Sequence, residues 1–227
     1  MARTVNLAAH TVRRDAFIEA AQRLMQAKGY EQMSVQDLLD ELEASRGAFY
    51  HYFDSKQALL EAVIDRMVDA GLAAVEPVAR DPQLPAARKL EEVFSTIGRW
   101  KTERKSLVLS LLTVWMSDDN AIVREKLRRT MVRRLVPTLA PIIQQGIDEG
   151  TFHADPAEET ARVFVMLLQG FQDIATELFL DRQAGRIELA TVEQTFANYS
   201  SAIERILGAP AGSVHLIDRS VLHAWFG

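Results

Sequence analysis

The sequence predicts an all-α fold, and three observations support this prediction. Apolar residues recur at spacings of three and four along most of the 227 residues, which is the period of an amphipathic helix. The sequence contains neither sustained alternation of apolar and polar residues, the pattern of a half-buried strand, nor an Asn-Gly hairpin. Glycine, proline and serine stand at the ends of the periodic segments, where they stop or cap helices.

Four helices are expected in the N-terminal third. The first apolar stripe ends at Gly29, since glycine suits the left-handed position after a helix. Ser34 is a good N-cap for the second helix, and Asp37 three residues later resembles a capping box. A third, short helix begins at Ser45, and Ser55 begins the fourth.

Three prolines in residues 76–85 predict a connection, and the clearest joint in the chain. Beyond it, helices are expected at about 86–104, 105–117, 119–149, 156–182 and 188–207. Pro137 and Pro141 predict a bend or break in the third of these, because proline removes a helix hydrogen bond. The tail, 208–227, begins as a linker and ends with apolar residues.

The composition is that of an ordinary globular protein, with 48% hydrophobic and 25% charged residues. No apolar run reaches the roughly 18 residues that a membrane span needs, and the start has no apolar signal region. There are no cysteines, which excludes disulfides and thiolate chemistry. We therefore expect a cytoplasmic protein with no membrane partner. Because the formal net charge is −5, binding to nucleic acid would need a local basic patch such as residues 1–14.

About three residues separate the second and third helices, which is the spacing of a helix-turn-helix. In that motif the second helix lies in the major groove of DNA. Phe49 would face the small core. Arg46 can donate to guanine, while Gly47 and Ala48 keep the surface thin enough for the backbone to approach the groove.

The polar aromatic residues that follow fit the same prediction. Tyr50 and Tyr52 can bring hydroxyl groups to phosphate oxygens, and His51 can contact a base edge or a phosphate. Lys56, at the start of the fourth helix, suits a phosphate. The alternatives are a half-buried aromatic cluster for these rings and a solvated helix start for Arg46. Likewise, the basic run 124–134 is read as a solvated helix face rather than a second nucleic-acid patch.

Residues 13–67 resemble the DNA-binding region of the tetracycline-repressor (TetR) family of bacterial regulators. The motif S-x-G-x-x-Y-x-x-F-x-S-K falls on Ser45, Gly47, Tyr50, Phe53, Ser55 and Lys56. The resemblance implies that Tyr50 and Lys56 contact phosphates, that residues 45–52 contact bases, and that the Ser34 cap donates to a phosphate. One departure is Glu43, which stands where the family's turn usually has glycine. A positive φ there would cost roughly 1 kcal/mol.

The resemblance also implies a small-molecule site, largely apolar, in the C-terminal part. Its candidate walls are Trp100, Trp115, Met116, Met166 and Phe171. The alternative for each of these residues is ordinary packed core. Helix 156–182 has an apolar arc wider than one core face needs, formed by Val163, Phe164, Leu167, Leu168, Phe171, Ile174, Ala175 and Leu178. Helix 188–207 has an apolar row at spacings of three and four, formed by Val192, Phe196, Tyr199, Ile203 and Ile206. Two such helices from each subunit would close a four-helix bundle, which predicts a homodimer.

The expected organisation is a helix-turn-helix domain in 1–55, an effector-binding and dimerisation domain in 56–208, and a tail in 209–227. The expected function is a transcriptional repressor that a small molecule releases from a palindromic operator in double-stranded DNA. The alternative is a helix-turn-helix protein that a protein partner controls, or that has no effector. Because the sequence has no catalytic motif and no metal-ligand spacing among its histidines, we expect no enzyme activity, cofactor or metal.

Overall fold

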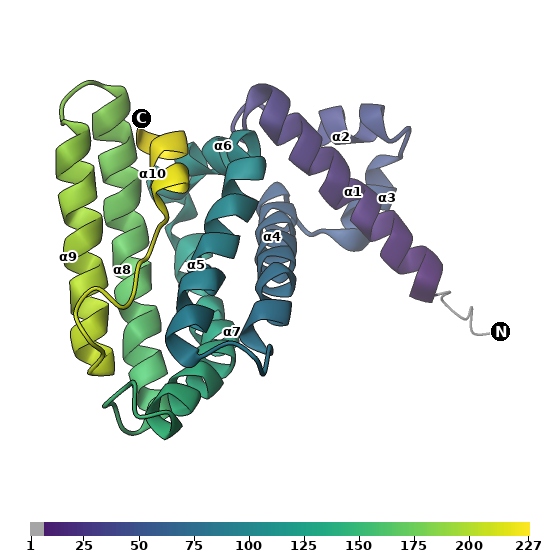
Figure 1. Cartoon of the computed structure of the whole chain (residues 1–227). Helices are drawn as coiled ribbons and strands as arrows, with labels where there is room; N and C mark the ends of the chain where they lie inside the picture. Colours follow the sequence, from purple (N-terminus) through teal and green to yellow (C-terminus); the bar gives the residue numbers. More distant parts are fainter. Residues whose placement is uncertain (1–6) are drawn as a thin grey trace. The chain divides into compact units, whose positions relative to one another are not determined.

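The computed structural model describes the backbone of residues 7–227 and all of their side chains except those of Leu7, Thr113 and Trp115. Its helices are α1 (Leu7–Lys28), α2 (Val35–Glu41), α3 (Arg46–Tyr52), α4 (Lys56–Ala79), α5 (Ala86–Glu103), α6 (Lys105–Met116), α7 (Ala121–Asp148), α8 (Ala157–Gln183), α9 (Leu189–Leu207) and α10 (Arg219–Phe226). A 3-10 turn, η1 (Asp118–Asn120), precedes α7 (Figure 1). Within residues 7–227 no strand is present, and the all-α prediction is confirmed. Residues 1–6 of the predicted basic arm lie outside the described residues.

The chain forms two compact units. The N-terminal unit comprises residues 1–70 and 104–125, and the C-terminal unit comprises residues 71–103 and 126–227. α4 runs without interruption from one unit into the other, and α7 begins in the first unit and continues in the second. The predicted division at residue 55 falls between α3 and α4, inside the N-terminal unit, and it stays a prediction.

The N-terminal unit has a core built from one face of each of its helices. Its largest fully buried side chains include Phe17, Phe49, Leu38 and Leu59. The rings of Phe17 and Phe49 meet edge to face with centroids 5.7 Å apart, a favoured geometry for aromatic pairs. Val114 of α6 packs on the same cluster, so a helix distant in sequence completes this core.

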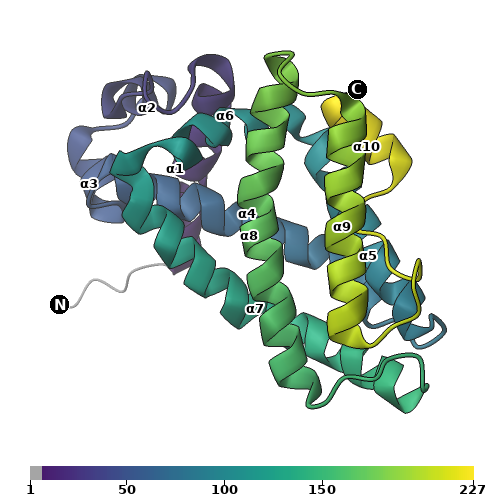
Figure 2. The same ribbon diagram turned by 90° about the vertical axis from the view of Figure 1, so that its left-hand side faces the viewer.

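In the C-terminal unit α8 and α9 lie side by side and antiparallel (Figure 2). The tail does not remain loose, since α10 packs on α5, α8 and α9. The ring of Phe226 lies 5.7 Å from that of Phe196, and the indole nitrogen Nε1 of Trp225 donates to Thr102 Oγ1 at 2.9 Å. An N-cap at Asp218 starts α10, because its carboxylate accepts from the amide of Val221.

The prolines interrupt the helices less than the sequence predicts. α4 continues through Pro77 to Ala79, so the connection before α5 is shorter than the predicted 76–85. Pro77 lies in the last turn of its helix. The backbone hydrogen bond that it lacks there destabilises the helix little. α7 also continues through Pro137 and Pro141, so it does not break there, and a bend at these prolines stays a prediction. Each proline removes one hydrogen bond, which the packing of a 28-residue helix outweighs.

The row predicted on the second interface helix needs a correction. Val192, Phe196 and Ile203 of α9 are buried within the chain itself. Phe196 meets Phe171 of α8 with centroids 4.7 Å apart and also packs on α10. These side chains therefore form the core of the C-terminal unit and are not available to a second subunit.

Candidate DNA-binding site

The turn between α2 and α3 has the geometry of a Schellman motif. The amide of Ala44 donates to the Leu39 carbonyl at 2.9 Å, and the amide of Glu43 donates to the Asp40 carbonyl at 3.4 Å. Glu43 occupies the left-handed position with φ 46°, and no other non-glycine residue among those described has a positive φ. Helix α2 therefore ends in the geometry that usually requires glycine after the helix, although this chain has Glu43 at that position.

A capping box starts α2, as the sequence predicts. The Asp37 amide donates to Ser34 Oγ at 3.2 Å, and the Ser34 amide donates to Asp37 Oδ2 at 2.7 Å. The ammonium of Lys28, 2.7 Å from Asp37 Oδ1, and these bonds from Ser34 hold the pKa of Asp37 well below its usual value. The hydroxyl of Ser34 also donates to Asp37 Oδ2 at 2.8 Å, so it would have to rotate to reach a phosphate.

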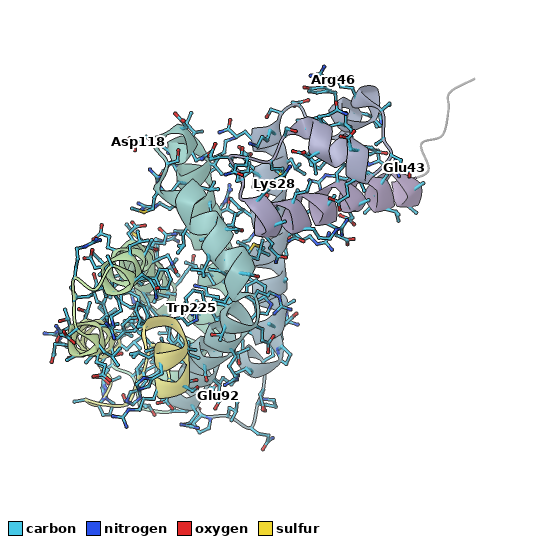
Figure 3. The ribbon with its side chains drawn as sticks, turned by 90° about the horizontal axis from the view of Figure 1, so that it is seen from above. Lys28, Glu43, Arg46, Glu92, Asp118 and Trp225 are labelled. Atoms are coloured by element: carbon cyan, nitrogen blue, oxygen red, sulfur yellow. The ribbon has the colours of Figure 1, made fainter. Side chains whose placement is uncertain are left out.

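Helix α3 presents a polar face to solvent and an aromatic face to the core. Ser45 caps it by accepting from the Ala48 amide at 3.2 Å, and Phe49 is fully buried. Arg46, Gly47 and His51 are exposed and Ala48 is half-buried. Figure 3 shows Arg46 at the edge of the N-terminal unit, directed away from its helices. Most of the predicted base-contacting residues therefore share one accessible surface.

Tyr50 belongs to this exposed surface. It is 48% exposed, and its ring rests edge to face on Phe49 with centroids 5.2 Å apart. The ring is thus supported from below by the core, which limits its freedom before any DNA contact forms. A contact between the hydroxyl and a phosphate would therefore cost little further side-chain conformational entropy.

Tyr52 is less exposed than Tyr50, and its contact with a phosphate stays a prediction. It is half-buried, and its ring packs against α1, 4.7 Å from the ring of His10 and 5.9 Å from that of Phe17. The reason is the helical period: Tyr52 follows Phe49 by three residues and shares its face. His51 stays exposed and touches both Tyr52 and His10 edge to face.

Lys56 at the start of α4 is held by the turn that follows α1. Its ammonium lies 4.1 Å from the centroid of the Tyr30 ring and donates to the carbonyl of Glu31 at 3.3 Å. Burial lowers the pKa of Lys56, while nearby Glu31 and Asp37 act in the opposite direction. The lysine therefore supports the fold of the N-terminal unit as well as being placed at a helix start.

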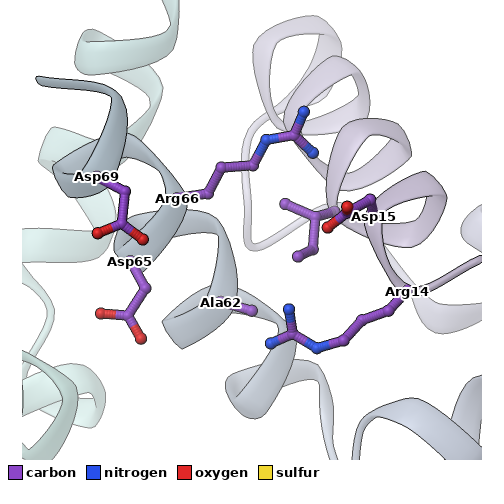
Figure 4. A pocket seen from close by; sticks show the side chains of 7 residues that line it. Arg14, Asp15, Ala62, Asp65, Arg66 and Asp69 are labelled. Carbon is purple, nitrogen blue, oxygen red and sulfur yellow. The ribbon is translucent and has the colours of Figure 1, made fainter. Parts of the chain in front are cut away.

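A charged pocket of about 330 Å³ lies between α1 and α4 within the same unit (Figure 4). Its side chains include Arg14, Asp15, Asp65 and Asp69, with Arg66 at one side. Nη2 of Arg66 pairs with Glu19 at 2.7 Å. With acids and bases in near balance, this pocket favours neither an anion nor a cation.

The predicted walls of the effector site are dispersed. Met166 is 61% exposed on α8, whereas Phe171 is buried against α9, where its ring lies 4.5 Å from that of Tyr199. Trp100 of α5 is half-buried, and Met116 is exposed in the N-terminal unit. The side chain of Trp115 lies outside the described residues. A second surface pocket, of about 410 Å³, is lined by other residues on α7 and the start of α8, including Pro141.

Both units of the chain match families of known proteins. Residues 17–63 match the family described as "Bacterial regulatory proteins, tetR family", and residues 113–193 match "Tetracyclin repressor-like, C-terminal domain". The first match contains the capped α2, the Schellman turn and α3. The chain is therefore a helix-turn-helix transcriptional regulator. It belongs to the tetR family, whose members bind operator DNA as dimers and respond to small-molecule effectors.

Relatives and solved structures agree with this assignment. The transcriptional regulator EthR of Mycolicibacterium smegmatis is 30% identical over 144 residues, which are 56% of this chain and 66% of that protein. The repressor DhaR of Mycobacterium sp. strain GP1 is 24% identical over 158 residues, 70% of this chain and 79% of its own length. A TetR regulator of Haloarcula marismortui shares the fold, with a TM-score of 0.63 and 23% identity over 85% of this chain and 98% of that one.

One helix bears on the expectation that the protein has no membrane partner. Among residues 7–227, α8 alone is long and apolar enough to cross a membrane by length and composition. A single helix of this kind is weak evidence, because helices of soluble proteins pass the same test. Two of its exposed apolar side chains, Val163 and Met166, lie on one side of the helix. The proposed function assigns this surface to a dimer interface.

Proposed function

We propose that this protein is a cytoplasmic homodimeric repressor that binds a near-palindromic operator through α3 and leaves it when a small molecule binds the C-terminal unit. The observation that carries the proposal is the exposed face of α3 above an inward-facing Phe49. Arg46 at the first turn supplies a fork of donors for guanine, and Gly47 lets the backbone approach the groove. A Cβ on Gly47 would meet only Ser45 Oγ, at 3.9 Å, so the folded chain itself does not require glycine there.

Phosphate contacts in this proposal come from Tyr50 and Lys56, with Ser34 at the start of α2. Tyr50 is 48% exposed, and its ring packs on that of Phe49. Lys56 would exchange its hydrogen bond with the Glu31 carbonyl for a phosphate oxygen, which is a stronger, charge-assisted partner. Tyr52 has a positioning role, since it fixes α3 against α1.

The dimer in this proposal uses the outward side of α8. Val163, Met166 and Gly170 follow one another at helical spacing and are exposed. A Cβ on Gly170 would have nothing within 4 Å, so the surface beside it is open to a second helix. Monomeric proteins rarely leave such large apolar side chains together on one helix face, and burial against a second copy would remove them from water.

A repressor named among the relatives, DhaR, favours repression over activation for this chain. The competing function is a helix-turn-helix protein under the control of a protein partner. A small-molecule effector is favoured because residues 113–193 match the family described as "Tetracyclin repressor-like, C-terminal domain".

The DNA contacts can be tested by titrating labelled operator DNA at two salt concentrations. Arg46→Ala should weaken operator binding by roughly 1–3 kcal/mol and relax preference at one base pair per half-site. Tyr50→Phe should weaken operator and unrelated DNA alike, because it removes only a phosphate contact. Arg23→Ala is the control, since this exposed α1 arginine pairs with Glu41 away from α3. If Arg46→Ala and Tyr50→Phe both fold and bind like the parent protein, α3 is not the recognition helix.

A further inference from the structure

A cluster of three rings joins the first turn of α1 to the last turn of α3. The centroid of the His10 ring lies 5.5 Å from that of His51 and 4.7 Å from that of Tyr52. The rings of His51 and Tyr52 meet edge to face with centroids 4.9 Å apart. His10 and Tyr52 are half-buried, whereas His51 is exposed, like Arg46 and Tyr50 on the same helix. We call His10 and His51 the histidine pair.

The histidine pair can hold one positive charge more easily than two. A cation within about 6 Å of the centroid of a tyrosine ring is attracted by that ring, and Tyr52 lies within this distance of both histidines. Either histidine, once protonated, therefore has an aromatic partner. Two imidazolium groups with centroids 5.5 Å apart would repel each other. The pair is therefore suited to a single proton.

The charged side chains beside the histidine pair supply no counter-charge. Neither histidine makes a hydrogen bond or an ion pair with any residue of the described part of the chain. The charged residues within four positions of the pair along the sequence are Arg13, Arg14 and Asp54. Arg13 and Asp54 are exposed, and the guanidinium of Arg14 lies over the ring of Phe53, 5.3 Å from its centroid.

The other helices that pack on α1 supply no counter-charge either. The three acids of α2 each have another partner, and the pairs are Glu41 with Arg23, Asp37 with Lys28 and Asp40 with Gln36. The two basic partners on α1 lie in its last two turns, at the opposite end from His10. Lys105 is the one charged residue of α6. Among the described residues packed on α1 there is thus no anion to stabilise a proton on the pair.

We propose that the histidine pair takes up one proton from solvent when α3 binds DNA, and that a phosphate of the DNA is the anion that stabilises it. The proposal rests on the function proposed above, because it requires α3 to face the DNA. His51 would carry the charge, since it is the exposed member of the pair. His10 is a positioning residue, because its ring packs on both His51 and Tyr52. The complex then binds more protons than the free protein, so the affinity for DNA should rise as the pH falls from about 8 to about 6.

The test measures binding of the full-length protein to labelled duplex DNA of mixed sequence, because contacts with phosphates do not depend on the base sequence. At low salt the parent protein should bind about tenfold more tightly at about pH 6 than at about pH 8. The slope of log binding constant against log salt concentration should be steeper by about one at the lower pH, since one more phosphate is neutralised. Calorimetric titrations in two buffers of different ionisation enthalpy should show that protons are taken up on binding.

Four variants assign this response to the histidine pair. His51→Gln should bind like the parent protein at about pH 8 and lose the rise in affinity towards about pH 6, because it cannot take up the proton. His10→Phe keeps a ring against α3 and should retain the rise. His10→Lys places a fixed positive charge beside His51, so the rise should move to lower pH, which a residue that only fills space would not cause. His223→Gln replaces an exposed histidine of α10 and is the control, which should respond to pH like the parent.

Three results would overturn the proposal: equal affinity at both pH values, a rise that survives in His51→Gln, or identical pH profiles for His10→Lys and His10→Phe. Circular dichroism shows whether each variant folds. If His10→Lys does not fold, the comparison of His51→Gln with His223→Gln decides, because both replace exposed histidines. If the pH response is absent while Arg46→Ala and Tyr50→Phe still weaken operator binding, α3 binds DNA and only the proton uptake is refuted.

Discussion

Replacing Glu43 by glycine should stabilise the protein. A residue with a Cβ pays about 1–2 kcal/mol in the left-handed conformation, which Glu43 adopts with φ 46°. Its side chain is exposed and makes no hydrogen bond within the described residues, so its removal breaks no contact. Glycine has greater conformational freedom in the unfolded chain, which reduces this stabilisation by about 0.4–1 kcal/mol. The net gain is therefore about 0.5–1 kcal/mol, or a rise in Tm of about 1–4 °C for a chain of this size.

The comparison with Glu43→Ala isolates the backbone effect. Alanine removes the same charge and most of the side chain but keeps the Cβ, so its Tm should not rise. Calorimetric melting of the parent protein and both variants measures this difference directly. Both variants should bind DNA slightly more tightly, because each removes a negative charge from the turn before α3. If glycine and alanine variants melt together, the turn is not strained and the reasoning is refuted.

Two further predictions concern DNA binding and assembly. Lys56→Met removes the hydrogen bond with Glu31 and the contact with the Tyr30 ring, so it should cost about 1 kcal/mol of stability. Lys56→Met should also weaken binding to all DNA sequences, and the slope of log binding constant against log salt concentration should become shallower by about one. An unchanged slope would show that Lys56 does not contact a phosphate. Met166→Asp places a charge on the outward side of α8, where Met166 is 61% exposed, so a folded monomer should sediment where the parent is a dimer. A dimer that persists would place the interface elsewhere.

The local structure was determined largely by the sequence itself. The helix ends near Gly29 and Ser45 and the capping box of Ser34 with Asp37 follow from groups at most a few residues apart. Even the positive φ of Glu43 could be anticipated, because the Schellman hydrogen bonds that require it lie within α2 and its turn. Such features depend on short-range geometry, which neighbouring residues specify without reference to the rest of the chain.

Which partner covers each helix face was decided only by the tertiary structure. The periods of α3 and α9 show that Tyr52 and Phe196 each lie on an apolar face, but not that α1 covers the first and α8 with α10 the second. The hydrogen bond between Lys101 and Gln172, which are 71 residues apart, has no signal in the sequence. Burial is a sum over contacts between distant segments, whereas helical periodicity is local. The pattern therefore predicts that a face is apolar, and only packing determines whether core, a second subunit or a ligand fills the space beside it.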